Sequence, residues 1–272
     1  MPVLNEVLLK TVWLTLAIAG RYLVMSGLVH AWVWRPVGRA TRLNRDRPEL
    51  RRIGHELALS LGSSVIYALP AAVALDAWKH GGTRMYVDPG LYGWAWLPVS
   101  FVVYLLAQDA FYYWAHRLMH RPSLFRWFHA GHHRSRQPTA FAAFAFDPLE
   151  AALTAWLLPA LTFVVPIQVG VVMTLLMFMS CTAVFNHCGW EVLPQAWVRG
   201  PLGRWFISAT HHSGHHVRFT CNYGLYLRAW DRWMGTDLMP GEAASHSPMT
   251  AVDVRGAVVM RERAPADPAA VL

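Results

Sequence analysis

Histidines gather in one part of the chain, at spacings typical of metal ligands. Ten of the 14 histidines lie between residues 116 and 216. Residues three or four apart share one face of a helix, so each close-set group can direct its imidazoles to one point. The first two groups are His116 with His120, and His129 with His132 and His133. Five histidines at both spacings predict a metal site.

Proline separates these two groups. Pro122 cannot sit inside a helix and favours an extended conformation at Arg121, but it suits the first position of a new helix. The sequence therefore predicts a helix, a sharp corner and a second helix. A corner of this kind can turn both imidazole faces towards the same place.

The pattern returns downstream, where residues 210–216 read Thr-His-His-Ser-Gly-His-His. His212, His215 and His216 repeat the spacing of the second group, and His211 adds a pair with His215. His187 stands alone at the end of a long apolar run. A catalytic zinc keeps three protein ligands and a structural one four, so eight to ten imidazoles are enough for two ions. Imidazole suits iron, copper, nickel and zinc, and the ligand type alone does not name the metal.

These motifs resemble those of the membrane-bound fatty acid hydroxylase/sterol desaturase superfamily, over roughly residues 95–240. The matching blocks are H-x3-H at 116–120, H-x2-H-H at 129–133, Asn-His at 186–187 and H-H-x2-H-H at 211–216. Flanking matches are Asp109, Tyr113-Trp114, Pro148-Leu149-Glu150, Asn222-Tyr223-Gly224, Trp230-Asp231-Arg232 and Gly235-Thr236. The resemblance implies a non-haem di-iron centre that uses O2 to oxidise a lipid.

Eight histidines are predicted to be ligands of two iron ions, with His187 as a ninth and His211 as a further candidate. The eight are His116, His120, His129, His132, His133, His212, His215 and His216. No catalytic residue is predicted beyond the metal ligands. Some members of the superfamily carry a histidine four residues after the position of His187, where this chain has Glu191. Asp109, about two helical turns before His116, is expected to hold a ligand imidazole by its second nitrogen. Glu191 is expected either to bind the metal or to orient a ligand, and the resemblance alone implies supporting roles for Asn222 and Asp231.

Composition predicts an all-α integral membrane protein. Hydrophobic residues make up 55% of the 272 residues and charged residues only 15%, which exceeds the usual soluble balance. Apolar stretches at 7–34, 53–76, 91–115 and 148–187 are long enough to cross about 30 Å of hydrocarbon. The last stretch is long enough for two crossings or one deep hairpin, bent at Pro159 or Pro166. Four to five crossings are therefore expected.

The positive charges predict the orientation. Twenty of the 24 Lys and Arg lie in residues 35–52, 116–137 and 188–272, which five crossings place on one side. By the positive-inside rule this side is cytoplasmic, the N-terminus is outside, and the histidine centre faces the cytoplasm, as expected in an inner (cytoplasmic) membrane. The basic charge thus reports topology and not a nucleic-acid partner.

The chain is expected to divide into three regions. Residues 1–90 hold N-terminal membrane helices and a basic loop, residues 91–240 the catalytic region, and residues 241–272 a flexible tail. His30, His55, His80 and His246 fit no histidine block, and structural roles are expected for them. The three cysteines form no C-x-x-C pair, which argues against an iron–sulfur cluster or a disulfide framework.

The predicted function is hydroxylation or desaturation of a membrane lipid, such as a sterol or fatty acyl chain, in lipid biosynthesis. The chain has no G-x-G-x-x-G and no C-x-x-C-H, so a separate electron donor, cytochrome b5-like or a ferredoxin with its reductase, is expected. Two alternatives are a histidine-rich metal transporter and a haem-binding membrane protein. The histidines lie at span ends, which disfavours an ion path, and they outnumber haem axial positions. The lipid is expected in an apolar slot lined by Phe101, Leu105, Met177 and Val184.

Overall fold

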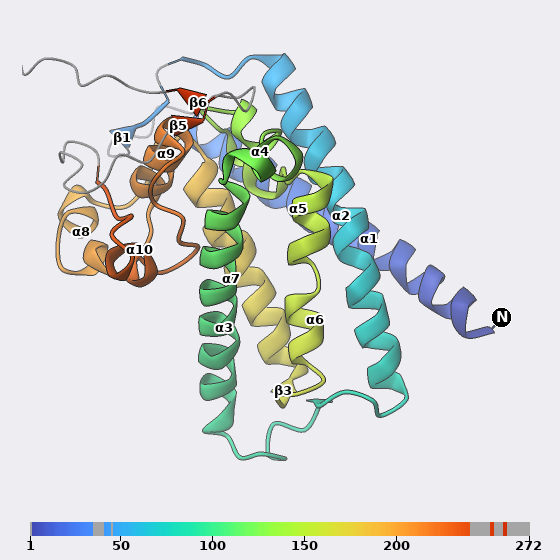
Figure 1. Cartoon of the computed structure of the whole chain (residues 1–272). Helices are drawn as coiled ribbons and strands as arrows, with labels where there is room; N and C mark the ends of the chain where they lie inside the picture. Colours follow the sequence, from blue (N-terminus) through green and yellow to red (C-terminus); the bar gives the residue numbers. More distant parts are fainter. Residues whose placement is uncertain (1, 35–40, 45, 240–250, 253–257, 260–272) are drawn as a thin grey trace, which may run out of the picture.

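The computed structural model describes residues 2–34, 41–44, 46–239, 251–252 and 258–259. The protein is helical, as the sequence predicts (Figure 1). Its long helices are α1 (Pro2–Val33), α2 (Leu50–Lys79), α3 (Trp96–Met119) and α7 (Val169–His187). The shorter α5 (Pro148–Thr154) and α6 (Leu157–Leu161) follow one another between α3 and α7 in the chain. The expected tail, including His246, lies outside the described residues except for two short strands, β5 (Ala251–Val252) and β6 (Val258–Val259).

Short elements connect and cover these helices. They are α4 (Pro122–Phe128), η1 (His132–Arg134), η2 (Ala140–Phe144), α8 (Gln195–Val198), η3 (Leu202–Arg204), α9 (Ala209–Arg218) and α10 (Ala229–Trp233). Four two-residue strands form two pairs: β1 (Thr41–Arg42) is antiparallel to β4 (Trp190–Glu191), and β2 (Met85–Tyr86) is parallel to β3 (Ile167–Gln168). The short elements α4, α9 and η1 lie towards the same end of the bundle, where the histidines are found (Figure 1).

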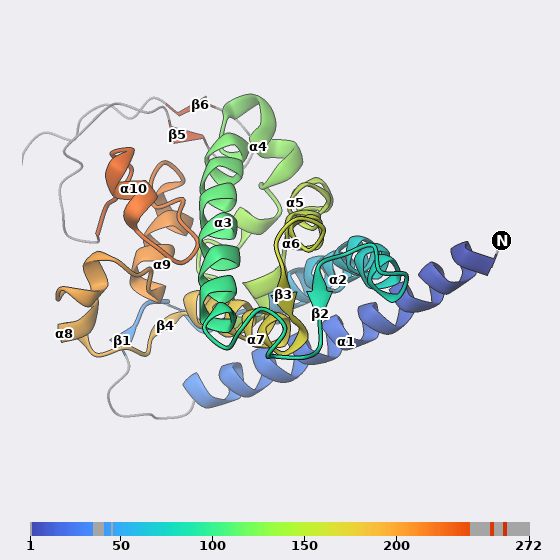
Figure 2. The ribbon, with the colours of Figure 1, turned by 90° about the horizontal axis from the view of Figure 1, so that it is seen from below.

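The opposite end of the bundle joins segments that are far apart in the sequence. Lys79 forms an ion pair of 2.8 Å with Glu6, and the Arg84 amide donates to the Thr162 carbonyl at 2.7 Å. At the histidine end, Val33 of α1 packs with Val184 of α7. The chain thus runs between the two ends in α1, α3 and α7 and returns in α2 and in α5 with α6. Seen from below, α1 crosses α2 and α7 obliquely (Figure 2).

Three helices in the described part of the chain are long and apolar enough to cross a membrane: Leu4–Val33, Leu50–Lys79 and Val169–His187. Their outward side chains are apolar, as lipid contact requires; Leu16 and Met173 are each more than half exposed. The protein is therefore an integral membrane protein. Helix α3 and the α5–α6 pair lie in the bundle beside these three helices and would supply the other two of the five expected crossings. The number of crossings and their orientation stay predictions.

The corner predicted at Pro122 is confirmed. Helix α3 ends at Met119, Arg121 is extended with φ −65° and ψ 139°, and Pro122 begins α4. The second histidine group differs from a single helical face, because α4 ends at Phe128. His129 has a φ of −146°, and His132 and His133 fall in the 3-10 turn η1. The second histidine group is therefore not carried by one continuous helix.

Candidate metal centre

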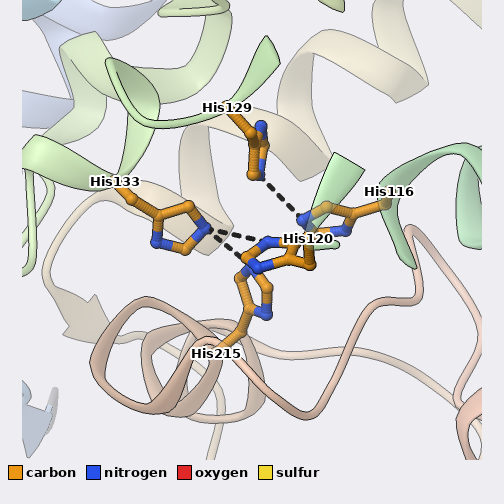
Figure 3. A group of neighbouring side chains, drawn as sticks. All are labelled: His116, His120, His129, His133 and His215. Carbon is orange, nitrogen blue, oxygen red and sulfur yellow. Dashed lines mark hydrogen bonds between the residues drawn. The ribbon is translucent and has the colours of Figure 1, made fainter. Parts of the chain in front are cut away.

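Five imidazoles converge where α3, α4, η1 and α9 meet (Figure 3). Their nitrogens that could bind a metal all lie within 4.8 Å of one another, and all five side chains are buried. We call this set group A: His116, His120, His129, His133 and His215. The shortest contacts join Nε2 of His116 to Nε2 of His129 at 2.9 Å and Nε2 of His133 to Nε2 of His215 at 3.0 Å.

Four further imidazoles form group B: His132, His187, His212 and His216. Nε2 of His212 lies 2.8 Å from Nε2 of His187 and 3.1 Å from Nε2 of His216. The two groups are adjacent, since the ring centroids of His133 and His216 are 4.9 Å apart. The structure thus brings together the eight predicted ligands and His187, in two sets.

The histidine blocks contribute to both groups. His129 and His133 point into group A, whereas His132 points into group B; in α9, His215 points into A and His212 and His216 into B. Neighbouring residues on a helical turn differ in direction by about 100°. The adjacent pairs His132–His133 and His215–His216 therefore diverge, and each pair spans the boundary between the groups.

The hydrogen bonds at the second ring nitrogens fix the tautomers. Nδ1 of His116 lies 2.9 Å from the Tyr223 carbonyl, and Nδ1 of His129 lies 2.7 Å from Oε2 of Glu150. A carbonyl or carboxylate oxygen only accepts, so Nδ1 carries the proton and Nε2 of the neutral ring holds a bare lone pair. The 2.9 Å contact between the two Nε2 atoms then joins two acceptors, which repel unless a cation lies among them.

The same geometry recurs in both groups. Nδ1 of His215 donates to the Cys221 carbonyl at 2.7 Å, Nδ1 of His132 to Ala145 at 3.1 Å, and Nδ1 of His187 to Ala183 at 2.8 Å. The Nε2 atoms of His132 and His187 therefore also face each other as acceptors, 3.4 Å apart. Donation from Nδ1 to a fixed oxygen is the usual arrangement behind a metal-bound imidazole.

Burial keeps these imidazoles neutral. It lowers the pKa of His129 to about 3. Burial first, and neighbouring histidines second, also lower the pKa values of five further rings well below 6.5: His132, His133, His212, His215 and His216. A metal needs the deprotonated nitrogen, and these rings present it at neutral pH. The donor set therefore fits two metal ions, and their binding stays a prediction.

His211 lies outside both groups. Its Nε2 is 3.0 Å from Oδ1 of Asp237, and the same carboxylate receives two hydrogen bonds from Arg228, of 2.8 and 2.7 Å. The Asn222 amide donates to the His211 carbonyl at 3.0 Å. The structure thus places His211 in a network that ties α9 to the segment after α10.

The predicted supporting residues act on the backbone that carries the ligands. Glu191 accepts the Thr210 amide at 2.9 Å, at the positive N-terminal end of α9. Asp231 accepts the amides of Tyr223 and Gly224, both at 2.8 Å, and thereby holds the carbonyl that meets His116. The Glu191 carboxylate does not belong to either histidine group.

Asp109 and Asn222 have similar roles. Asp109 accepts the amides of Tyr226 and Leu227 at 2.8 and 3.0 Å, so it binds backbone and not an imidazole. Asn222 adopts a left-handed φ of 61° and exchanges two hydrogen bonds, both of 2.7 Å, with the backbone of Leu238. Both residues fix the loop between α9 and α10.

Three carboxylates near the centre were not predicted as site residues from the sequence. Glu150, fully buried, orients His129. Asp147 accepts the amides of Gly131 at 2.7 Å and His132 at 3.3 Å, and a Cβ at residue 131 would lie only 2.2 Å from its Oδ1. The sequence feature that could have identified them is an acidic residue inside or beside an apolar stretch, because an unpaired charge is costly there and must find a partner.

The third carboxylate, Glu56 of α2, secures the segment after the second histidine group. It is 1% exposed and accepts from both the hydroxyl and the amide of Thr139. His55 places Nε2 2.9 Å from the Gly131 carbonyl, and Asn44 donates to the Pro138 carbonyl at 2.7 Å. The N-terminal region thus contributes directly to the position of His132 and His133.

Comparison with known proteins agrees with these motifs. A profile described as fatty acid hydroxylase matches residues 101–236. The Delta(7)-sterol 5(6)-desaturase ERG3B of Gibberella zeae is 32% identical over 160 residues, which cover 59% of this chain and 48% of that protein. Lathosterol oxidase is 30% identical over 174 residues in Homo sapiens (63% and 56%) and 29% over 200 residues in Mus musculus (72% and 65%). The chain thus spans about half to two thirds of these relatives. No solved structure matches it.

Proposed function

Because the chain belongs to the fatty acid hydroxylase family, we propose that it is a membrane oxidoreductase that hydroxylates or desaturates a lipid with O2. The observation that carries the proposal is the pair of adjacent histidine groups, in which bare Nε2 lone pairs face one another inside the protein. Two cations would turn these repulsive contacts into ligand bonds. Group A would hold one iron and group B the other.

Iron fits the reaction, since zinc has no redox chemistry. When bound, the two irons would supply O2 activation and oxidation of an unactivated C–H bond, which is chemistry that a protein leaves to its cofactor. The contribution of the chain is to hold the rings. Glu150 and the carbonyls of Tyr223, Cys221, Ala145 and Ala183 fix which nitrogen faces inward in five of the nine rings.

Burial has a second role in this proposal. The rings of His129, His133, His215 and His216 have no exposed surface, so bulk water is kept from the centre. Exclusion of water protects reactive species and strengthens electrostatic contacts inside the site. The burial of these rings therefore supports a centre that is shielded from bulk water.

A sterol is the first substrate to test, and desaturation the first reaction, because the relatives reported above carry sterol names. Entry from the bilayer agrees with the apolar outer side of α3, where Val102 and Leu106 are exposed. The slot expected from the sequence is not formed by one set of residues. Phe101 and Leu105 pack around Tyr104 and Leu175, whereas Val184 packs with Val33 and Ala140.

The described structure contains an apolar pocket in the half of the bundle away from the histidines. Tyr104 of α3 and Leu175 of α7 line it, together with Leu14, Ala71 and Leu158. Tyr104 and Leu175 each precede a histidine of the centre by twelve residues, about 18 Å along a helix. A long lipid with its reacting carbon at the histidines could therefore extend its apolar end towards this pocket.

Electrons would come from a separate donor, cytochrome b5-like or a ferredoxin with its reductase. Docking on the cytoplasmic face is part of the proposal, and the asymmetry of Lys and Arg supports that orientation. The basic residues at the histidine end include the exposed Arg51 and Arg121. Their charge suits an acidic donor surface.

Purification in lipid nanodiscs with metal analysis, an absorption spectrum and an activity assay tests the proposal. We expect two irons per chain, no Soret band, and O2-dependent conversion of a Delta(7)-sterol when electrons are supplied. A Soret band would favour the haem alternative, and metal transport without oxidation would favour the transporter. Conversion of a water-soluble compound in preference to any membrane lipid would refute the lipid assignment even with both irons present.

A further inference from the structure

A surface of exposed aromatic side chains lies outside the three candidate spans. Its members belong to α8, η3, α10 and the residues that follow them, and each is between 37% and 67% exposed. We call it the aromatic surface: Trp197, Leu202, Trp205, Phe206, Trp233 and Met234. A concentration of exposed apolar side chains marks an interaction surface.

The aromatic surface rests on a firmly tied base. The Arg228 amide donates to the Trp205 carbonyl at 2.9 Å, and its guanidinium donates to the Gly203 carbonyl at 2.5 Å. A Cβ at Gly203 would lie 1.9 Å from the Val198 carbonyl oxygen, so η3 and α8 are in close contact. The aromatic rings are therefore displayed by packed backbone.

This surface continues the lipid-facing side of α3. Trp114 of α3 is 49% exposed and meets the ring of Trp230 at 5.9 Å, while Trp230 also stacks on Tyr113 at 5.9 Å. Trp230 in turn contacts Trp233 at 5.4 Å. Both views place α10 beside α3 and α8 farther out, on the other side of the bundle from α2, and Figure 1 shows α10 level with the upper part of α3.

Arginines accompany the aromatic rings. Arg199, Arg204 and Arg232 are exposed, and the Arg232 guanidinium lies 5.2 Å from the centre of the Trp205 ring. Tryptophan is enriched at membrane–water interfaces because its ring is apolar with a polar edge. Arginine binds phosphate through several donors at once. This pairing is the composition of helices that lie in a membrane surface.

We propose that the aromatic surface is embedded in the headgroup region of the leaflet at the histidine end, with its arginines on the phosphates of anionic lipids. The same block carries Asp231, which holds the Tyr223 backbone that orients His116. Embedding would therefore set the depth of the metal centre relative to the acyl chains. The proposal depends on the membrane location and not on the oxidative activity.

Fluorophores at single cysteines can measure this depth in the full chain. Cys188 and Cys221 are buried, so a Cys181→Ala background leaves an introduced cysteine as the accessible thiol. Trp233→Cys carries the label, with Phe206→Cys as the second variant. Leu16→Cys, 58% exposed in α1, is the deep control, and Glu49→Cys, exposed before α2, is the aqueous control. The nanodiscs contain phosphatidylcholine with a minor fraction of phosphatidylglycerol.

Labels on residues 233 and 206 should be quenched by nitroxides near the lipid headgroup and protected from aqueous iodide. The label on residue 16 should respond to deep nitroxides, and the label on residue 49 to iodide alone. Iodide quenching at 233 and 206 equal to that at 49 would overturn the proposal. If the labels on residues 233 and 206 are protected from iodide only when a soluble electron donor is added, the aromatic surface binds a protein partner and the membrane proposal is overturned. Iron content, measured on the same samples, reports separately on the proposed function.

Discussion

The division of the histidines into a group of five and a group of four gives a sharp test of the ligand assignment. His132→Ala would leave group B with three imidazoles, whereas His116→Ala would leave group A with four. Loss of a partner behind a ligand costs 10–100-fold in metal affinity, so loss of the ligand itself should cost more than about 100-fold. In the His132→Ala protein we expect iron to fall from two to about one per chain and turnover to be abolished.

His211→Ala is the matched control, because this residue belongs to the same histidine block as His212 yet lies outside both groups. Its ring is 1% exposed and is bound to Asp237 at 3.0 Å. The substitution should keep both irons and lower the free energy of unfolding by about 1–3 kcal/mol, the usual cost of a lost buried hydrogen bond. Iron per chain, turnover and thermal unfolding would be measured on monodisperse protein.

Two results would refute this reasoning. Full iron and activity in the His132→Ala protein would show that group B binds no essential metal. Loss of one iron in the His211→Ala protein, with normal folding, would place His211 among the ligands.

Three further predictions rest on other contacts. Glu150→Gln should weaken iron binding about 10–100-fold, because the amide is a poorer acceptor for His129 than the carboxylate; iron titration measures this, and unchanged affinity would contradict it. Glu56→Ala should lower the free energy of unfolding by about 1–3 kcal/mol, because it leaves the donors of Thr139 unpaired. Glu56→Gln should lower it less, and equal losses for the two variants in a denaturation assay would argue against a role of the hydrogen bonds. A reporter fused after Leu272 should be active only in the cytoplasm, and activity on the outer side would overturn the orientation.

Local spacing made the helices and the ligand candidates predictable. Apolar runs indicated the long helices, and Pro122 indicated the corner, because each depends only on neighbouring residues. The division between the groups was not predictable in this way. The continuous helix α9 carries the same spacing and still sends His215 into group A and His212 and His216 into group B. The division depends on which histidines of other segments each ring meets.

Contacts between distant segments explain the rest of what the sequence could not show. Glu56 and Thr139 are 83 residues apart, and His116 meets the carbonyl of Tyr223 across 107. Backbone acceptors leave no trace in a motif, because any residue offers a carbonyl. Buried carboxylates are different: an acidic side chain in an apolar stretch must find donors or become neutral. Glu150 satisfies this need with His129 and Tyr112, and Glu56 with Thr139. A carboxylate within such a stretch therefore predicts a hydrogen-bonding partner. Where the carboxylate lies near a histidine block, that partner is the ring of a metal ligand or the backbone of the segment that holds the ligand.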